Sequence, residues 1–173
     1  MKVRILRDAL AVMIANTIEV YKRESYGTLV GEKHNGFVSV RNAVPFQAVK
    51  QKFSGVETIS DRAGRLEQAL ETIGLGRVVG DYHSHPSHGD NFYPPEPSNT
   101  DLESMLASDL PAHIILSIHD KKRTMPWHYC TDGRLAGSVN GYWIDIAAYF
   151  KTNDEEFKRT RIVCPYAIRK KLT

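Results

Sequence analysis

Two histidines separated by one residue follow a segment with the pattern of a buried strand. This segment, residues 77–82 (RVVGDY), is short, contains two adjacent valines and follows two glycines, which is typical of a strand in a sheet core. Side chains alternate between the two faces of a strand, so His83 and His85 are expected to point to one side and Ser84 to the other. Two imidazoles placed in this way can bind one metal ion, and the sequence therefore predicts a metal site at the end of this strand.

A third ligand can come from the helix that follows. Residues 86–97 are rich in proline, glycine and asparagine, which predicts a loop, and Ser98 then begins an amphipathic helix that extends to about residue 107. Asp101 can complete a set of two imidazoles and one carboxylate, which suits Zn²⁺ and leaves a fourth position open for water. Taken alone, Ser98 and Asp101 are more typical of a helix N-cap and its acidic first turn.

Other histidines and acidic residues are weaker candidates for metal ligands. His88, Asp90 and Glu96 lie in the predicted loop, and their setting is typical of solvated polar side chains. His113 and His119 flank a strongly apolar segment, which favours a structural role for both.

A further candidate for the metal site, Glu24, lies upstream of the two histidines. An isolated glutamate after a helix is normally a solvated side chain, but here it opens the sequence ESYGTLVG, residues 24–31. This segment, HSHP at 83–86 and PSNTDL at 97–102 together resemble the JAMM, or MPN-plus, zinc metalloprotease family. The family pattern is a glutamate at a strand start, H-[ST]-H-P, and S-x-x-D at a helix start. The resemblance covers most of residues 5–130.

The resemblance implies a role for each residue of the pattern. His83, His85 and Asp101 would hold one Zn²⁺ per chain, with water as the fourth ligand. Glu24 would accept a proton from that water and pass it to the leaving amine, and Ser98 would donate a hydrogen bond to the oxyanion of the tetrahedral intermediate. The family often cleaves the amide bond after the C-terminal Gly-Gly of ubiquitin or a ubiquitin-like protein, so conjugates of such proteins are the expected partners.

The loop between the second histidine and the serine is longer here than is usual in the family. Extra length in a surface loop costs little closure entropy, and the spacing from Ser98 to Asp101 is unchanged. The ligand assignment is therefore kept. Together with the irregular polar and aromatic residues 45–62, this loop is a candidate for binding an extended substrate tail by strand addition.

Helical and strand patterns alternate along the chain, which predicts an α/β protein. The resemblance implies more: an α/β/α sandwich of the deaminase-like kind, with a mixed, largely antiparallel sheet. At 173 residues, the length fits a single domain over 1–173. The expected elements are helices at about 4–22 and 63–73, strands at 25–31, 37–44 and 112–118, an antiparallel partner of the last at 124–130, a strand at 161–164, weak strand character at 56–59, and an undecided strand or helix at 141–150.

Composition narrows the class of protein further. Hydrophobic residues make up 42% and charged residues 25% of the chain, as in ordinary soluble domains. A net charge of +3 is too small to indicate nucleic-acid binding, and no apolar run has membrane-spanning length. Asp8 interrupts the N-terminal apolar stretch, which fits an amphipathic helix better than a signal peptide. Two cysteines without CxxC spacing favour free thiols and a cytoplasmic location.

Alternative functions stay open at this point. A non-catalytic scaffold of the same fold would be expected to lose the ligand set, whereas all five positions of the pattern are present. A nucleobase deaminase would carry H-x-E and C-x-x-C motifs, which are missing here. A zinc hydrolase acting on linear peptides or small conjugates remains an alternative. Glu19 is the second candidate for the proton acceptor, and Tyr82, Trp127 and His128 could line a cleft, although aromatic residues beside strands more often belong to a core.

Overall fold

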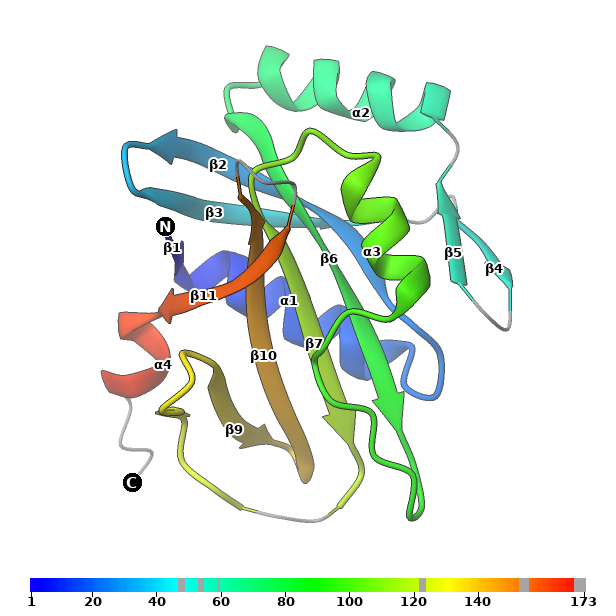
Figure 1. Cartoon of the computed structure of the whole chain (residues 1–173), viewed down its shortest axis with the longest axis vertical. Coiled ribbons are helices and arrows are strands. Elements are labelled where there is room, and N and C mark those ends of the chain that lie inside the picture. The colour runs from blue at the N-terminus through cyan, green and yellow to red at the C-terminus, as the bar shows by residue number, and fades with distance from the viewer. Residues whose placement is uncertain (47–48, 53–54, 59, 122–123, 153–155, 170–173) are drawn as a thin grey trace.

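The computed structural model describes residues 1–173 apart from 47–48, 53–54, 59, 122–123, 153–155 and 170–173. Its centre is one large sheet (Figure 1). The strands of this sheet are β1 (Lys2–Ile5), β2 (Tyr26–His34), β3 (Phe37–Pro45), β6 (Arg77–Ser87), β7 (His113–His119), β8 (His128–Tyr129), β9 (Leu135–Val139), β10 (Tyr142–Lys151) and β11 (Phe157–Val163).

The sheet curls so that its edge strand β11 returns to an inner strand, β10. Its strand order is β11-β1-β3-β2-β6-β7-β10-β9-β8, and β11 also pairs with β10. Three pairings are parallel, those of β1 with β11, β1 with β3, and β6 with β7. The other pairings are antiparallel. The prediction of an α/β fold with a mixed, largely antiparallel sheet is confirmed.

Helices lie on both faces of this sheet: α1 (Arg7–Glu19), α2 (Ser60–Thr72), α3 (Asn99–Leu106) and the short α4 (Pro165–Arg169). In Figure 1, α1 passes behind the strands and α3 lies in front of them. The packing agrees, because Met13 of α1 joins the same core as Ile114 of β7, whereas Met105 of α3 packs with the neighbouring Ile115. Successive residues of a strand face opposite sides. Within the described part of the chain, no helix is long and apolar enough to cross a membrane.

The N-terminus differs from the prediction of one helix over about 4–22. Residues Lys2–Ile5 form β1, which lies between β3 and β11. Val3 and Ile5 are fully buried, whereas the residues between and before them are exposed, which is the period of a strand and not of a helix. The helix begins at Arg7, and the positive φ of 80° at Lys22 lies just beyond its end.

β6, the strand that carries the two histidines, is longer than the predicted segment 77–82. It runs from Arg77 to Ser87 and includes Pro86. β2 pairs with β6 only as far as His83, whereas β7 pairs along it to Ser87. Pro86 therefore lies where β6 no longer has a ladder on both sides, which is where a strand tolerates a residue without an N–H group.

The C-terminal strands were predicted least well. The antiparallel partner of β7 is β10 and not the segment 124–130, of which only His128–Tyr129 forms a strand, paired with β9. β9 was not predicted. It joins β10 through Asn140 and Gly141, whose φ angles are 50° and 85°. Asn-Gly with two positive φ angles is the preferred two-residue hairpin turn, so the undecided segment 141–150 is the second strand of a hairpin.

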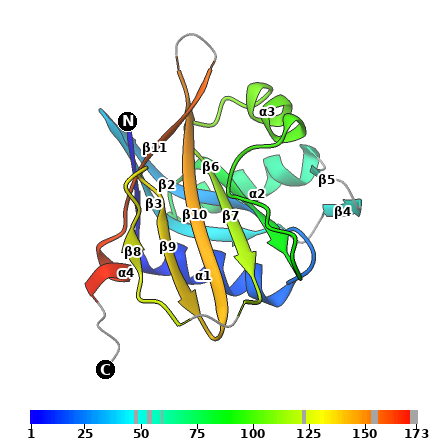
Figure 2. The same cartoon turned by 60° about the horizontal axis from the view of Figure 1, so that its bottom comes forward.

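Residues 45–62 contain more regular secondary structure than was predicted. β4 (Val49–Lys52) and β5 (Gly55–Thr58) form a separate two-stranded sheet, which projects beside α2 and α3 in Figures 1 and 2. The weak strand predicted at 56–59 thus corresponds to β5, with residue 59 outside the described residues. The following helix starts at Ser60 and ends at Thr72, so that Ile73 lies beyond it with 66% of its surface exposed.

Candidate metal centre

The three predicted metal ligands come together on one side of the sheet. His83 and His85 project from β6, and Asp101 projects from the first turn of α3. The Nε2 atoms of the two histidines are 3.1 Å apart. The carboxylate oxygens of Asp101 lie 3.3 Å from Nε2 of His83 and 3.4 Å from Nε2 of His85.

These separations fit a single small metal ion. Zinc–nitrogen and zinc–oxygen bonds of about 2.0–2.2 Å in a tetrahedron place neighbouring ligand atoms roughly 3.3 Å apart. The observed separations are 3.1–3.4 Å. The three side chains are also largely shielded, with exposed fractions of 12%, 13% and 20% for His83, His85 and Asp101. The donor set and its spacing could therefore hold a metal ion, and they fit the three-ligand arrangement that zinc adopts when one position is left for water.

The charge of this cluster favours a cation. Burial alone would raise the pKa of Asp101, but hydrogen bonds from the two histidines outweigh burial and hold this pKa well below its usual range. Burial would lower the pKa of His85. Its hydrogen bonds with Asp101 and the Pro94 carbonyl, together with the charges of Asp101 and Glu24, reverse that effect and raise the pKa. Asp101 is thus an ionised carboxylate at neutral pH, as a metal ligand must be.

The same local structure holds Asp101 in place. Ser98 is the N-cap of α3 and forms a capping box with Asp101. The Ser98 Oγ accepts a hydrogen bond from the Asp101 backbone N–H at 3.2 Å, and Asp101 Oδ2 accepts from the Ser98 N–H at 2.7 Å. The Ser98 hydroxyl also donates to Oδ2 at 2.7 Å. The capping interpretation of these residues is therefore confirmed, and it coexists with the predicted ligand role because the cap fixes the carboxylate.

Glu24 lies in the same cavity as the cluster. This cavity has a volume of about 620 Å³, and His83, Ser98 and Asp101 also line it. Glu24 precedes β2, which pairs with β6 in a register that places Tyr26 opposite His83. Its negative charge contributes to the raised pKa of His85. The position of Glu24 therefore suits a proton acceptor near the metal, although its role stays a prediction.

A chain of buried hydroxyl groups connects the Glu24 segment to the histidine strand. The Ser25 backbone N–H donates to Ser84 Oγ at 2.8 Å, and the Ser25 hydroxyl donates to the same oxygen at 2.9 Å. Thr17 of α1 extends the chain, with its Oγ1 2.9 Å from Ser25 Oγ. All three residues are almost fully buried. Nothing in the sequence pairs Ser25 with Ser84, because the contact depends on the β2–β6 register.

We expect Ser84→Ala to destabilise the protein. The substitution leaves the buried Ser25 N–H without the acceptor it has at Ser84 Oγ, which costs about 1–3 kcal/mol in the free energy of unfolding. Denaturant unfolding measures this loss. Ser138→Ala is a control, because the Ser138 hydroxyl also makes two hydrogen bonds, both to Met125, but lies less deeply buried. Equal stability of Ser84→Ala and the unsubstituted protein would contradict the expectation.

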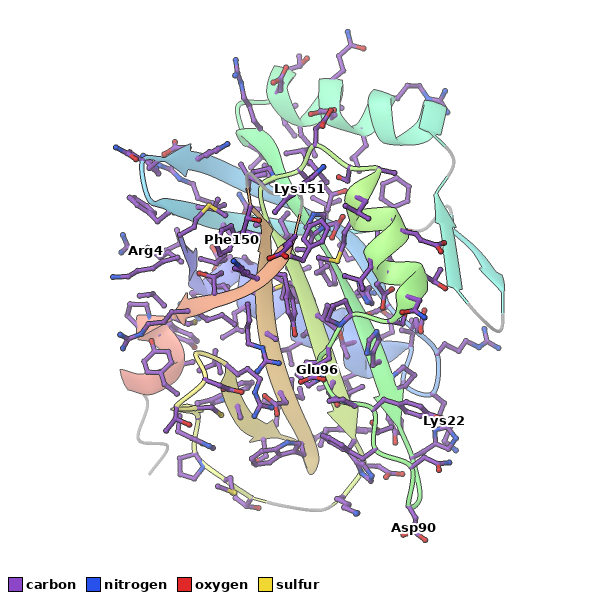
Figure 3. The ribbon with its side chains drawn as sticks, in the orientation of Figure 1. Arg4, Lys22, Asp90, Glu96, Phe150 and Lys151 are labelled. Carbon is purple, nitrogen blue, oxygen red and sulfur yellow. The ribbon has the colours of Figure 1, made fainter. Side chains whose placement is uncertain are left out.

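The alternative ligands and cleft residues lie elsewhere. His88 and Asp90 are exposed, and Figure 3 shows Asp90 at the tip of the turn beyond β6, with Glu96 over the middle of the sheet. Glu96 forms an ion pair with Arg159 at 2.8 Å. Among the described residues, His83, His85 and Asp101 form the one group of three or more His, Cys, Asp or Glu side chains that could hold a metal ion.

Four of the aromatic and histidine side chains singled out in the sequence, namely Tyr82, Trp127, His113 and His119, make structural contacts. Tyr82 is fully buried, and its hydroxyl donates to Asn16 Oδ1 at 3.0 Å. Trp127 packs against the main core. The Nδ1 of His113 lies 2.9 Å from Asp81 Oδ1, and the Nδ1 of His119 accepts from the Lys121 N–H at 2.9 Å. The cavity is lined instead by Tyr26, Thr28, Phe46, Glu67, Val78, Asp81, Thr100, Ser104, Met105, Ala107, Ser108 and Leu110.

Comparison with solved structures shows the same fold in another protein. The solution structure of protein DSY2949 from Desulfitobacterium hafniense superposes with a TM-score of 0.63. The match covers 94% of this chain and 92% of that chain, at 15% sequence identity. A search of curated proteins found no match.

Comparison with family models is more specific. The model named Prok-JAB, described as prokaryotic homologs of the JAB domain, matches residues 6–129. This match spans well over half of the chain and includes Glu24, the two histidines of β6, Ser98 and Asp101. The resemblance drawn from the sequence is thereby confirmed at the level of the family. The chain belongs to the prokaryotic JAB-domain family.

Proposed function

We propose that this chain is a zinc-dependent metalloprotease that hydrolyses the amide bond after the C-terminal Gly-Gly of a ubiquitin-like protein. The observation that carries the proposal is the convergence of His83, His85 and Asp101 at separations of 3.1–3.4 Å. Two of these residues, His83 and Asp101, line a cavity that Glu24 also lines. Membership of the JAB-domain family supports it. A family member that serves only as a scaffold has no need of these four residues together with Ser98.

The chain's own residues account for the steps of such a reaction. Zinc, when bound by His83, His85 and Asp101, supplies Lewis-acid activation of the attacking water. Glu24 accepts the proton that this water loses as its oxygen attacks the amide carbon, and returns it to the nitrogen as the C–N bond breaks. Ser98 donates a hydrogen bond to the carbonyl oxygen as negative charge develops there. For this last step the Ser98 hydroxyl must turn away from Asp101 Oδ2, to which it now donates.

The substrate tail is best accommodated on the side of the cavity that faces residues 45–62. Phe46 lines the cavity, and the β4–β5 hairpin follows it. An extended tail could add to a strand edge there through backbone hydrogen bonds. The loop 86–97 is less suited to this task, because its residues 93–96 are already hydrogen-bonded to the main sheet.

We expect Ser98→Ala to lower kcat by about 10²–10³-fold, the usual effect of losing one oxyanion donor. Loss of the N-cap would also cost about 1 kcal/mol of stability. Steady-state kinetics and thermal unfolding measure the two effects separately. Ser98→Thr, which keeps a hydroxyl that can both cap and donate, should recover both. A less stable Ser98→Ala protein with unchanged kcat would show that Ser98 is only a helix cap.

Three substrate classes offered side by side test the proposed function. The purified protein is incubated with conjugates of ubiquitin-like proteins, with linear peptides and with small conjugates, each with and without a zinc chelator. We expect cleavage after Gly-Gly of a ubiquitin-like protein, and inhibition by the chelator. Cleavage of only the peptides or small conjugates would favour a zinc hydrolase with a different substrate. A zinc-loaded protein that cleaves none of them would be a non-catalytic interaction module.

A further inference from the structure

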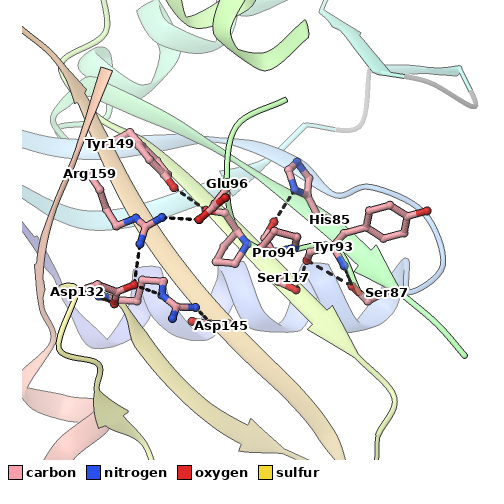
Figure 4. A network of polar contacts seen from close by, with 12 residues as sticks. His85, Ser87, Tyr93, Pro94, Glu96, Ser117, Asp132, Asp145, Tyr149 and Arg159 are labelled. Atoms are coloured by element: carbon pink, nitrogen blue, oxygen red, sulfur yellow. Dashed lines mark hydrogen bonds and ion pairs between the residues drawn. The ribbon is translucent and has the colours of Figure 1, made fainter. Parts of the chain in front are cut away.

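Residues 93–96, which we call the 93–96 segment, cross the sheet beside the candidate metal centre. Figure 4 shows the segment running from His85 to Arg159, over β7 and β10. At one end, Ser87 Oγ accepts a hydrogen bond from the Tyr93 N–H at 2.7 Å. At the other end, Arg159 donates to Glu96 Oε1 at 2.8 Å. The path of this part of the loop is thus fixed from both sides.

Three successive carbonyl groups of the 93–96 segment accept hydrogen bonds from three different strands. The Ser117 hydroxyl of β7 donates to the Tyr93 carbonyl at 2.6 Å. The Tyr149 hydroxyl of β10 donates to the Pro95 carbonyl at 2.8 Å, in a buried position. Burial raises the pKa of Tyr149, so its hydroxyl stays protonated and remains a donor.

The middle carbonyl of the three belongs to Pro94 and meets a predicted metal ligand. It lies 3.1 Å from Nδ1 of His85. A carbonyl oxygen only accepts hydrogen bonds, so Nδ1 must carry the proton, and in a neutral imidazole Nε2 then carries the free electron pair. Nε2 is the atom that faces His83 and Asp101. The Pro94 carbonyl therefore selects the tautomer and the ring orientation that metal binding needs.

Two prolines in succession make the 93–96 segment suited to this task. Pro94 and Pro95 have no N–H groups, and their φ angles are fixed by the ring. This stretch therefore presents acceptors without competing donors, and it cannot easily fold back on itself. The hydrogen bonds from Ser117 and Tyr149, on either side of the Pro94 carbonyl, attach this stiff stretch to the sheet with that carbonyl beside His85.

We propose that the 93–96 segment positions His85 for metal binding, and that Ser117 and Tyr149 are positioning residues that act through it. The inference rests on the metal centre of the proposed function and is independent of the substrate. It also gives a role to the longer loop between His85 and Ser98. Part of that loop supports a ligand, and does not merely connect β6 to α3.

Zinc affinity tests this inference without relying on turnover. Tyr149→Phe removes one hydroxyl and leaves the ring in place, and Ser117→Ala removes the neighbouring anchor. Competition with a chromophoric zinc chelator should show an affinity lower by roughly 10-fold in each, at the weaker end of the effect of outer partners on metal sites. The visible absorption spectrum of the cobalt-substituted variants should shift as well, because it reports ligand geometry.

Tyr82→Phe is the matched control. It also removes the hydroxyl of a buried tyrosine, in this case one that donates to Asn16 Oδ1, and should leave zinc affinity and the cobalt spectrum unchanged. Wild-type affinity and spectrum in both Tyr149→Phe and Ser117→Ala would overturn the inference and leave the metal centre standing. A wild-type protein that binds no zinc would overturn the metal centre and this inference together.

Discussion

Glu24→Gln is expected to abolish almost all turnover while the protein keeps its fold and its zinc. Glutamine has nearly the same shape as glutamate but cannot accept a proton at neutral pH. The loss of a general base lowers kcat by about 10²–10⁴-fold. Glu24 is not one of the three residues that converge at 3.1–3.4 Å, so zinc content should not change. Steady-state kinetics and elemental analysis of the same preparation measure both quantities.

Two other glutamates serve as controls for this substitution. Glu67 lines the same cavity from α2, so Glu67→Gln removes a negative charge from the cavity without removing the proposed base. Glu19, the alternative proton acceptor, is exposed at the end of α1 and is not among the residues that line the cavity. Both variants should keep most of the activity. Retained turnover in Glu24→Gln together with its loss in Glu19→Gln would reassign the base.

The double substitution His83→Ala with His85→Ala should remove zinc and activity together. It deletes two of the three ligand atoms and leaves Asp101 as a single carboxylate, which binds zinc weakly by itself. Elemental analysis is expected to find one zinc per chain in the unsubstituted protein and almost none in the variant. His128→Ala is a suitable control, because the His128 Nδ1 contacts the Pro126 carbonyl at 3.0 Å and the residue is outside the cluster. Equal zinc content in the double variant and the unsubstituted protein would contradict the assignment of His83 and His85 as zinc ligands.

The parts of the site that sequence could predict are those set by local rules. Strand alternation alone places His83 and His85 on one face. The boundaries of α3 were predicted within a residue, because Ser98 and Asp101 form a capping box whose spacing can be read directly from the sequence. The two rules together bring the ligands close only if α3 packs on the face of the sheet to which the two histidines of β6 point. That condition came from the family resemblance and is met in the structure.

What sequence could not predict depends on pairings between distant residues. β1, near the N-terminus, pairs with β11, near the C-terminus, as well as with β3. No local pattern specifies such neighbours. β10 pairs with β7, β9 and β11, so the partner of β7 was wrongly placed at 124–130. The Asn140–Gly141 turn was a local signal that could have identified the β9–β10 hairpin.

The contacts around the candidate metal ligands could not be predicted from the sequence for the same reason. Ser84 meets Ser25 across 59 positions, and Tyr149 meets the Pro95 carbonyl across 54. No local pattern in the sequence pairs these residues with one another. Only the register of the sheet shows that Ser84 fixes the segment after Glu24, and that Tyr149 supports the loop that contacts His85.

A single catalytic zinc is tested by stripping the protein of metal and adding zinc back. The rate of cleavage of a ubiquitin-like conjugate is measured at each step. The stripped protein should be inactive, and the rate should rise in proportion to added zinc and level off at one equivalent per chain. One equivalent is expected because the described residues contain one group of three ligands, His83, His85 and Asp101. Full activity of the stripped protein, or a rate that still rises beyond one equivalent, would contradict a single catalytic zinc at these residues.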